Sequence, residues 1–176
     1  MKISHGVKLE ILNNSGISIL EVIVAMAIIT MGMVGVLSLV IQNVEAQYIN
    51  KNILIASGLA QEGLELVRNI RDLNWLTPGV DPNNDWKRNI VGDGTYTIDY
   101  GLNIRNVSSI DEAGARLYVD GSGLYTHTAT ATSTSFYRLI TVVDNVTYLD
   151  IKCAIRWKDG TQNHNYTAET FLYNWR

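Results

Sequence analysis

Several residue types are scarce in this chain of 176 residues, and each scarcity excludes something. Cys153 is the single cysteine, so an intrachain disulfide is excluded and a folded domain must rest on its hydrophobic core. Pro78 and Pro82 are the only two prolines, and no Lys, Arg or His lies between Lys8 and Lys51. The formal net charge is −3, without a basic patch interleaved with aromatics, so charge predicts no nucleic-acid partner.

Motifs of enzyme sites are also missing. The sequence contains no GxSxG, HExxH, CxxC, Walker or GxGxxG pattern. The three histidines, His5, His127 and His164, are far apart in the sequence. Because a catalytic site needs a nucleophile with a base, an acid–base pair or a metal cluster, the sequence predicts no enzyme and no cofactor.

One short segment has a pattern that metal-binding loops share. Asp81-Pro82-Asn83-Asn84-Asp85 places oxygen-bearing side chains at alternate positions. An EF-hand would need Gly at the sixth position and Glu at the twelfth, where this chain has Trp86 and Gly92. An ordinary polar turn is therefore the preferred interpretation, and no metal site is predicted.

The most informative stretch is an apolar run near the N-terminus. Residues 22–41 are uncharged, and from Ile17 to Ile41 only Glu21 carries a charge. A helix of about 20 apolar residues is long enough to cross the core of a bilayer. A carboxylate in such a segment costs about 2.5–3.5 kcal/mol and usually has a partner. Because no cation is near in the sequence, the partner of Glu21 is expected to come from another molecule.

These residues resemble a known signature. Gly16 before Ile17-Ser18-Ile19-Leu20-Glu21 is similar to the prepilin motif of type IV pilins and pseudopilins, in which a polar leader ends in Gly and Glu is fifth in the mature chain. The resemblance implies that a prepilin peptidase cuts between Gly16 and Ile17 and methylates the new amino group of Ile17. It also implies that Glu21 faces the positive N-terminus of a neighbouring subunit. The first mature residue departs from the pattern, since Ile stands where Phe is commonest. The run Glu-Val-Ile-Val-Ala-Met-Ala-Ile and the missing Pro resemble minor pilins more than major ones, and a major pilin is the alternative.

The flanking charges predict an orientation. Lys2 and Lys8 precede the apolar run, so the N-terminus is expected to stay cytoplasmic while the rest is exported. An ordinary secretory signal is the rival interpretation, with cleavage after Val44-Glu45-Ala46 and a mature start near Gln47. Against it, the apolar run is longer than a usual signal core and contains Glu21.

Beyond the apolar run, the composition predicts that the helix continues to about Asn74. Apolar residues recur at helical spacing and are expected to cover a sheet: Leu59, Leu66, Val67, Ile70 and Leu73. Charge pairs are expected on the polar side, Glu65 with Arg68 and Arg68 with Asp72. Four glycines lie inside this helix, and each costs roughly 1 kcal/mol relative to Ala: Gly32, Gly35, Gly58 and Gly63.

The C-terminal part changes to a period of two, which is typical of strands. Strands are predicted at 95–102, 116–119, 124–127, 136–143, 147–157 and 163–175. Turns are predicted at 120–123 and at 159–160, and the Thr/Ser/Ala run at 126–135 is predicted to be an exposed loop or edge. In 147–157, Cys153 shares the apolar face and is interpreted as a small hydrophobe rather than a nucleophile or ligand.

These observations predict an α+β fold with a long N-terminal helix packed on a C-terminal antiparallel β-sheet. The expected parts are a leader (1–16), a membrane or filament-core half of the helix (17–43), an amphipathic half (44–74) and a β domain (75–176). By the resemblance, the chain is a structural subunit of a type IV pilus or a secretion-like filament. Its implied partners are other pilin subunits, prepilin peptidase, the membrane and the assembly machinery, before it reaches a cell-surface or periplasmic filament. The alternative is a membrane-anchored or secreted β-domain binding module.

Overall fold

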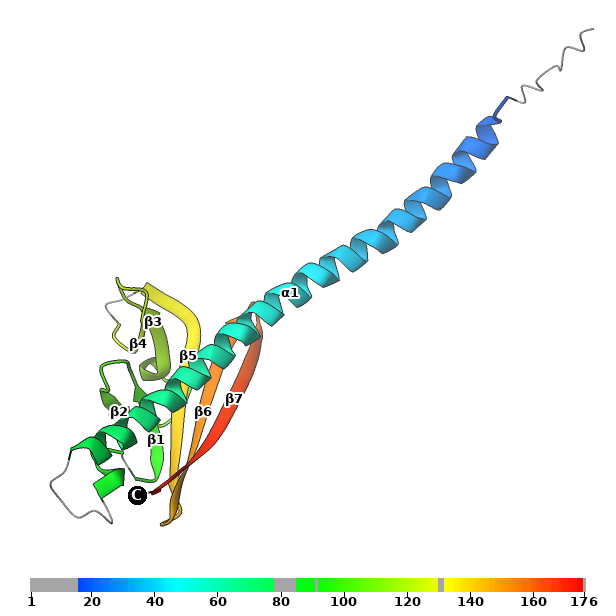
Figure 1. Ribbon diagram of the computed structural model, residues 1–176. Coiled ribbons are helices and arrows are strands. Elements are labelled where there is room, and N and C mark those ends of the chain that lie inside the picture. The colour runs from blue at the N-terminus through cyan, green and yellow to red at the C-terminus, as the bar shows by residue number, and fades with distance from the viewer. Residues whose placement is uncertain (1–15, 78–84, 91, 130–131, 176) are drawn as a thin grey trace, which may run out of the picture. The chain divides into compact units, whose positions relative to one another are not determined.

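The computed structural model describes residues 16–77, 85–90, 92–129 and 132–175 (Figure 1). The chain divides into two compact units, the first ending at Tyr48 and the second beginning at Ile49. The helix α1 (Ile19–Leu76) has 58 residues and contributes to both units. The first unit is helical from Ile19 onward, and the second contains the rest of α1 together with the described strands.

Among the described residues, the elements after α1 are two short 3₁₀ helices and seven strands: η1 (Asp85–Lys87), β1 (Gly94–Ile98), β2 (Ile104–Asn106), η2 (Ala113–Ala115), β3 (Arg116–Val119), β4 (Tyr125–Thr126), β5 (Thr132–Asp144), β6 (Tyr148–Asp159) and β7 (Gln162–Tyr173). Every strand pairing is antiparallel. The predicted α+β class, with one helix packed on an antiparallel sheet, is confirmed.

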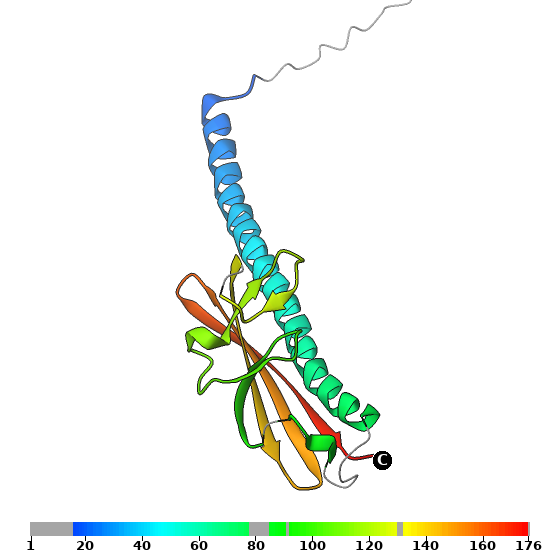
Figure 2. The same cartoon turned by 90° about the vertical axis from the view of Figure 1, so that its left-hand side faces the viewer.

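The seven-stranded sheet is organised around the long strand β5. One side of β5 pairs with β3 near Thr132 and with β1 near Ile140, and its other side pairs with β6 over nine residues. The β6–β7 hairpin is the most regular part, with twelve successive residue pairs (Figure 2). Its turn follows Asp159, as predicted, and Gly160 adopts a φ of 55°, which a side chain would disfavour.

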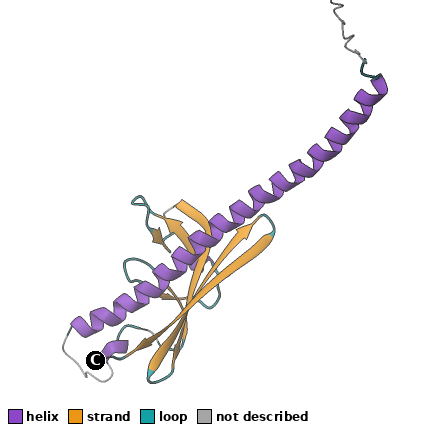
Figure 3. Ribbon diagram, turned by 45° about the vertical axis from the view of Figure 1, so that its right-hand side comes forward, coloured by secondary structure: helices purple, strands orange, loops and turns teal. Residues whose placement is uncertain are grey.

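The core of the second unit lies between α1 and one face of the sheet (Figure 3). On α1, small and aliphatic side chains are buried at helical spacing: Ala56, Leu59, Ala60, Leu64, Val67 and Ile70. On β6, alternate residues are buried as predicted: Leu149, Ile151, Cys153, Ile155 and Trp157. Burying an aliphatic side chain of this size contributes roughly 1.5–3 kcal/mol, so this layer supplies the stability that a disulfide does not.

A second, smaller cluster lies on the opposite face of the sheet. Leu139 of β5 is buried there by Val107 and Ala115, with Ile110 and Tyr137 packed against them. The residues between β2 and β3 therefore cover part of the outer face. This cover was not predicted, because nothing in the local sequence of 107–115 indicates which strand it will contact.

Some local predictions were wrong. β5 begins at Thr132 rather than Phe136, because Thr132 and Ser133 pair with β3, and β2 was not predicted at all. Tertiary pairing here overrides the weak signal of a polar run. Leu73, predicted to be buried, is 43% exposed, and α1 extends two residues beyond Asn74.

Candidate functional site

The segment with the prepilin-like motif lies at the start of the described part of the first unit. Gly16, Ile17 and Ser18 precede α1, and Glu21 lies in its first turn. The amide of Val22 donates to the carbonyl of Ser18 at 3.2 Å, which is the first bond of the helix. Ser18 and Glu21 have the spacing of a capping box. Yet the side chain of Glu21 makes no hydrogen bond or ion pair to any other residue that the structure describes, so its carboxylate does not cap the helix.

The described part of the first unit is exposed throughout. Every residue from Gly16 to Tyr48 is exposed, and Ile17 is 76% exposed. By its length and composition, this apolar stretch is long enough to cross a membrane, and none of its described residues is buried. Exposed apolar surface of this extent is unfavourable in water, so the segment requires apolar surroundings.

The helix surface of this unit also has room for a close neighbour. A shallow apolar hollow follows one side of the helix and is lined by Ile29, Gly32, Met33, Val36, Leu37 and Val40. A Cβ at Gly32 or Gly35 would meet no heavy atom within 4 Å. Packing within the unit therefore does not require these two glycines, whereas a second helix could use the space beside them.

In the second unit, a buried arginine joins the helix to the sheet. Arg138 of β5 is fully buried, and its Nη1 lies 3.2 Å from Oε1 of Glu62 on α1. Nη2 donates to the carbonyl of Ile98 at 2.7 Å, and Nη1 donates to the carbonyl of Leu59 at 3.4 Å. A buried guanidinium needs such partners, because an unpaired charge in the core is strongly destabilising. This contact fixes the position of α1 on the sheet.

Two potentially reactive side chains lie in the same core. Burial raises the pKa of the Cys153 thiol to about 12, so it stays protonated and unreactive. Burial, reinforced by the positive charge of Arg138, lowers the pKa of His127 to about 4. His127 Nδ1 lies 3.1 Å from the carbonyl oxygen of Arg116, and its Nε2 has no hydrogen-bond partner among the described residues. Neither group has the access that a catalytic residue needs.

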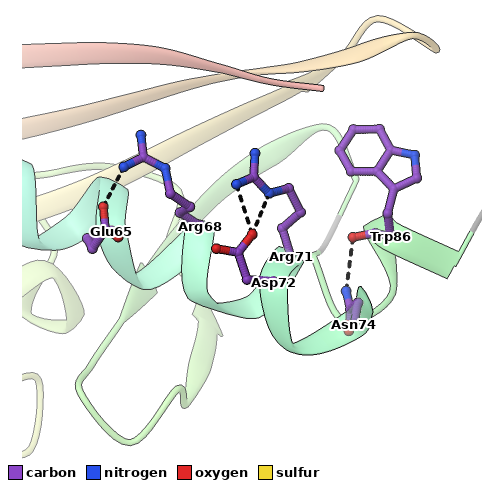
Figure 4. Close-up of polar contacts among 6 residues, drawn as sticks. All are labelled: Glu65, Arg68, Arg71, Asp72, Asn74 and Trp86. Atoms are coloured by element: carbon purple, nitrogen blue, oxygen red, sulfur yellow. Dashed lines mark hydrogen bonds and ion pairs between the residues drawn. The ribbon is translucent and has the colours of Figure 1, made fainter. Parts of the chain in front are cut away.

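Polar contacts hold the segment after α1 against the end of the helix (Figure 4). The side-chain amide nitrogen of Asn74, Nδ2, donates to the carbonyl of Trp86 at 3.0 Å and also to that of Arg88. Glu65 pairs with Arg68 at 2.6 Å, as predicted. The two bonds of Asn74 hold residues 86–88 against the end of α1, before the chain reaches β1.

The predicted pair of Arg68 with Asp72 does not form. Asp72 instead accepts a hydrogen bond from Nε of Arg71 at 2.9 Å (Figure 4). The Arg71 guanidinium lies 4.6 Å from the ring centre of Trp75, which meets Trp175 edge-on at 4.3 Å. The end of the chain is thereby held against the end of α1.

The candidate metal loop falls largely outside the described residues, which omit 81–84. Within the described residues, no group of three or more His, Cys, Asp or Glu side chains is placed to hold a metal ion.

Comparisons of the chain with protein-family models, with curated proteins and with solved structures found no match. Sequence reasoning named Gly16, Ile17 and Glu21, which lie together in one segment, but it missed Arg138 and His127. The sequence did contain a signal for Arg138, because in the alternation of β5 it lies on the same face as the apolar residues Phe136 and Ile140. His127 had no such signal, because its burial depends on the sheet around it.

Proposed function

We propose that this chain is a structural subunit, of the minor pilin or pseudopilin kind, in a type IV pilus or a secretion-like filament. The observation that carries the proposal is a carboxylate, unpaired within the described part of the chain, at the start of an exposed apolar helix. Glu21, without a partner among the described residues, stands in the first turn of an exposed apolar helix, five residues after Gly16. An isolated carboxylate in apolar surroundings needs a positive partner.

The proposed mechanism begins with cleavage. A prepilin peptidase hydrolyses the peptide bond between Gly16 and Ile17, and the new amino group of Ile17 is methylated. The apolar helix anchors the subunit in the membrane, with the second unit on the extracytoplasmic side. On assembly, the Glu21 carboxylate of one subunit neutralises the Ile17 ammonium of its neighbour while the helices pack together. Desolvation offsets much of the attraction in such a pair, so its main role is to set the register between subunits.

The second unit supports this proposal by its construction. Its helical part has one face buried on the sheet, and Arg138 fixes the helix to β5 through Glu62. A subunit that is pulled or sheared in a filament benefits from a helix attached to its globular part by both a core and a buried ion pair. The lack of a disulfide in this chain makes that attachment more important.

The decisive experiment is N-terminal sequencing and intact-mass measurement of the mature full-length chain, expressed with and without a prepilin peptidase. We expect a start at methylated Ile17 only when the peptidase is present. Gly16→Val should abolish this processing, whereas the neighbouring Ser15→Ala should be processed normally. A retained Met1 in the presence of an active peptidase would remove the main support for the filament.

The alternative function, a membrane-anchored or secreted binding module, predicts a different N-terminus for the mature chain. An ordinary signal peptidase would leave a chain starting near Gln47, and a simple anchor would keep Met1. Either result would favour a function in which the second unit binds its ligand independently of a filament.

A further inference from the structure

The outer face of the sheet contains a hollow of about 200 Å³. It lies beside the segment that covers this face and is lined by Ile110, Asp111, Tyr137, Arg156, Trp157, Lys158 and Asn163. Side chains on a strand point alternately to the two faces. On β6, Ile155 and Trp157 belong to the core under α1, so Arg156 and Lys158 project to the opposite, outer face.

Positive charge is concentrated around this hollow. In the sheet register, Tyr137 lies between Arg116 on β3 and Arg156 on β6. The guanidinium of Arg116 is 5.9 Å from the ring centre of Tyr137. Lys158 lies further along β6, paired in register with Asn163, and its side chain makes no hydrogen bond or ion pair to another described residue. Asp111 also lines the hollow and contributes one negative charge, so Arg116, Arg156 and Lys158 leave a positive balance around it. In a chain whose formal net charge is −3, this balance favours an anionic ligand.

Arg156 already holds a carboxylate in this position. Its Nη1 bonds the carboxylate of Asp111, while its Nε donates to Oδ1 of Asn165 at 3.0 Å. Arg156 is thus oriented by the sheet, and its planar fork matches a carboxylate. The side chain of Asp111 is 72% exposed and that of Arg156 is 27% exposed. An exposed ion pair of this kind contributes little to stability, so an external carboxylate can replace Asp111.

The remaining lining suggests what carries that carboxylate. The hollow is smaller than the roughly 300–1,000 Å³ of pockets for drug-sized ligands, so it has room for about one ring. Ile110 and the ring of Tyr137 offer apolar surface, while the Asn163 amide and the Lys158 ammonium can bond hydroxyl groups. A ring with C–H faces, hydroxyl groups and one carboxylate combines these features.

We propose that this hollow binds an acidic sugar residue, a uronate, whose carboxylate takes the place of Asp111 on Arg156. Lys158 adds a second positive charge beside the carboxylate. The site would let the second unit attach to an acidic polysaccharide. The proposal rests on side chains of the second unit alone and not on the proposed filament.

The test is isothermal titration calorimetry on the full chain in detergent, with galacturonate as the probe. Galactose, acetate and inorganic phosphate are titrated in parallel. We expect galacturonate to bind, and to bind at least tenfold more tightly than each of the other three. Binding should weaken as salt is raised, because the carboxylate is recognised by exposed cations.

Three variants make the assignment specific. Asp111→Asn removes the competing carboxylate and should tighten galacturonate binding by up to about fivefold, which corresponds to about 1 kcal/mol. Arg156→Gln should weaken it at least tenfold. Lys152→Gln is the matched control, because Lys152 lies on the outer face of the same strand but outside the hollow, where it pairs with Glu169 at 3.2 Å. It should leave the affinity unchanged.

The outcomes separate the possibilities. Absence of galacturonate binding to both the wild type and Asp111→Asn would overturn the proposal. So would equal affinity for acetate or phosphate, which would make the hollow a general anion site rather than a sugar site. If Arg156→Gln fails to fold, the sign of the Asp111→Asn effect still decides, because weaker or unchanged binding contradicts replacement of Asp111.

Discussion

Gly63 of α1 lies against Cys153 of β6 so closely that a Cβ at position 63 would be 2.6 Å from the sulfur atom. The same Cβ would be 3.2 Å from Cδ of Arg138. The absence of a side chain at position 63 therefore permits this close approach of the helix to the sheet. This close approach also brings Glu62, the neighbour of Gly63, to Arg138.

The first prediction concerns this contact. Gly63→Ala should destabilise the second unit by about 1–3 kcal/mol, because added volume in a packed core forces neighbouring atoms to shift. Gly58→Ala, in the same helix, is the control: its Cβ would meet nothing within 4 Å, so it should stabilise by about 0.5–1 kcal/mol. Denaturant unfolding followed by tryptophan fluorescence measures both. Equal effects of the two substitutions would show that helix propensity, not packing, determines the change in the free energy of unfolding.

The second prediction concerns the buried ion pair. Glu62→Gln should cost about 1–2 kcal/mol, because it leaves the fully buried Arg138 with only carbonyl partners. The cost should stay below that of a fully buried pair, since Glu62 is in part exposed. Glu65→Gln removes an exposed partner of Arg68 on the same helix and should cost less than about 0.5 kcal/mol. Thermal unfolding compares the two variants, and a larger loss in Glu65→Gln would contradict the assigned role of Arg138.

The contact between Gly63 and Cys153 also shows how far the sequence alone predicts the fold. The alternation around Cys153 was enough to predict its burial, because period two is a property of one strand. Gly58 and Gly63 were equally unusual inside a helix, and only the sheet opposite them distinguishes an open position from a close contact. Local patterns thus predicted which face is buried, but not which residue lies across from it.

The same limit applies to the charged side chains. The pair of Glu65 with Arg68 was predicted correctly, since both lie on one helix face three residues apart. Asp72, however, pairs with Arg71, whose guanidinium is held by the ring of Trp75. The partner of an arginine depends on aromatic neighbours that come from tertiary structure. The Arg156 site could not be predicted either, because Asp111 meets it from a segment 45 residues away.

The third prediction concerns the dependence of stability on pH. Burial, with the nearby Arg138, lowers the pKa of His127 to about 4 in the folded chain, against an ordinary value near 6.5. Between these values the unfolded chain binds a proton that the folded chain does not, so stability falls as the pH falls from about 6.5 to about 4. Below that window the loss is complete and is on the order of 3 kcal/mol.

His127→Gln should reduce this loss, because the group that titrates is removed. Unfolding free energies of the variant and the wild type are compared at pH 7.5 and at pH 4.5. His164→Gln, in the same unit, is the matched comparison, and it controls for the general effect of acid on carboxylates. If His127→Gln and the wild type lose the same stability between the two pH values, His127 is not the group responsible.

The last prediction concerns Glu21 and the proposed filament. Glu21→Gln keeps the size and the helix but removes the charge that would neutralise the Ile17 ammonium of a neighbouring subunit. We expect normal membrane insertion and cleavage after Gly16, but at least tenfold less of the variant in sheared filaments, measured by quantitative immunoblotting against the membrane fraction. Glu45→Gln changes a second exposed carboxylate on the same helix and should assemble normally. Normal incorporation of Glu21→Gln would mean that the charge is dispensable and that helix packing alone sets the register.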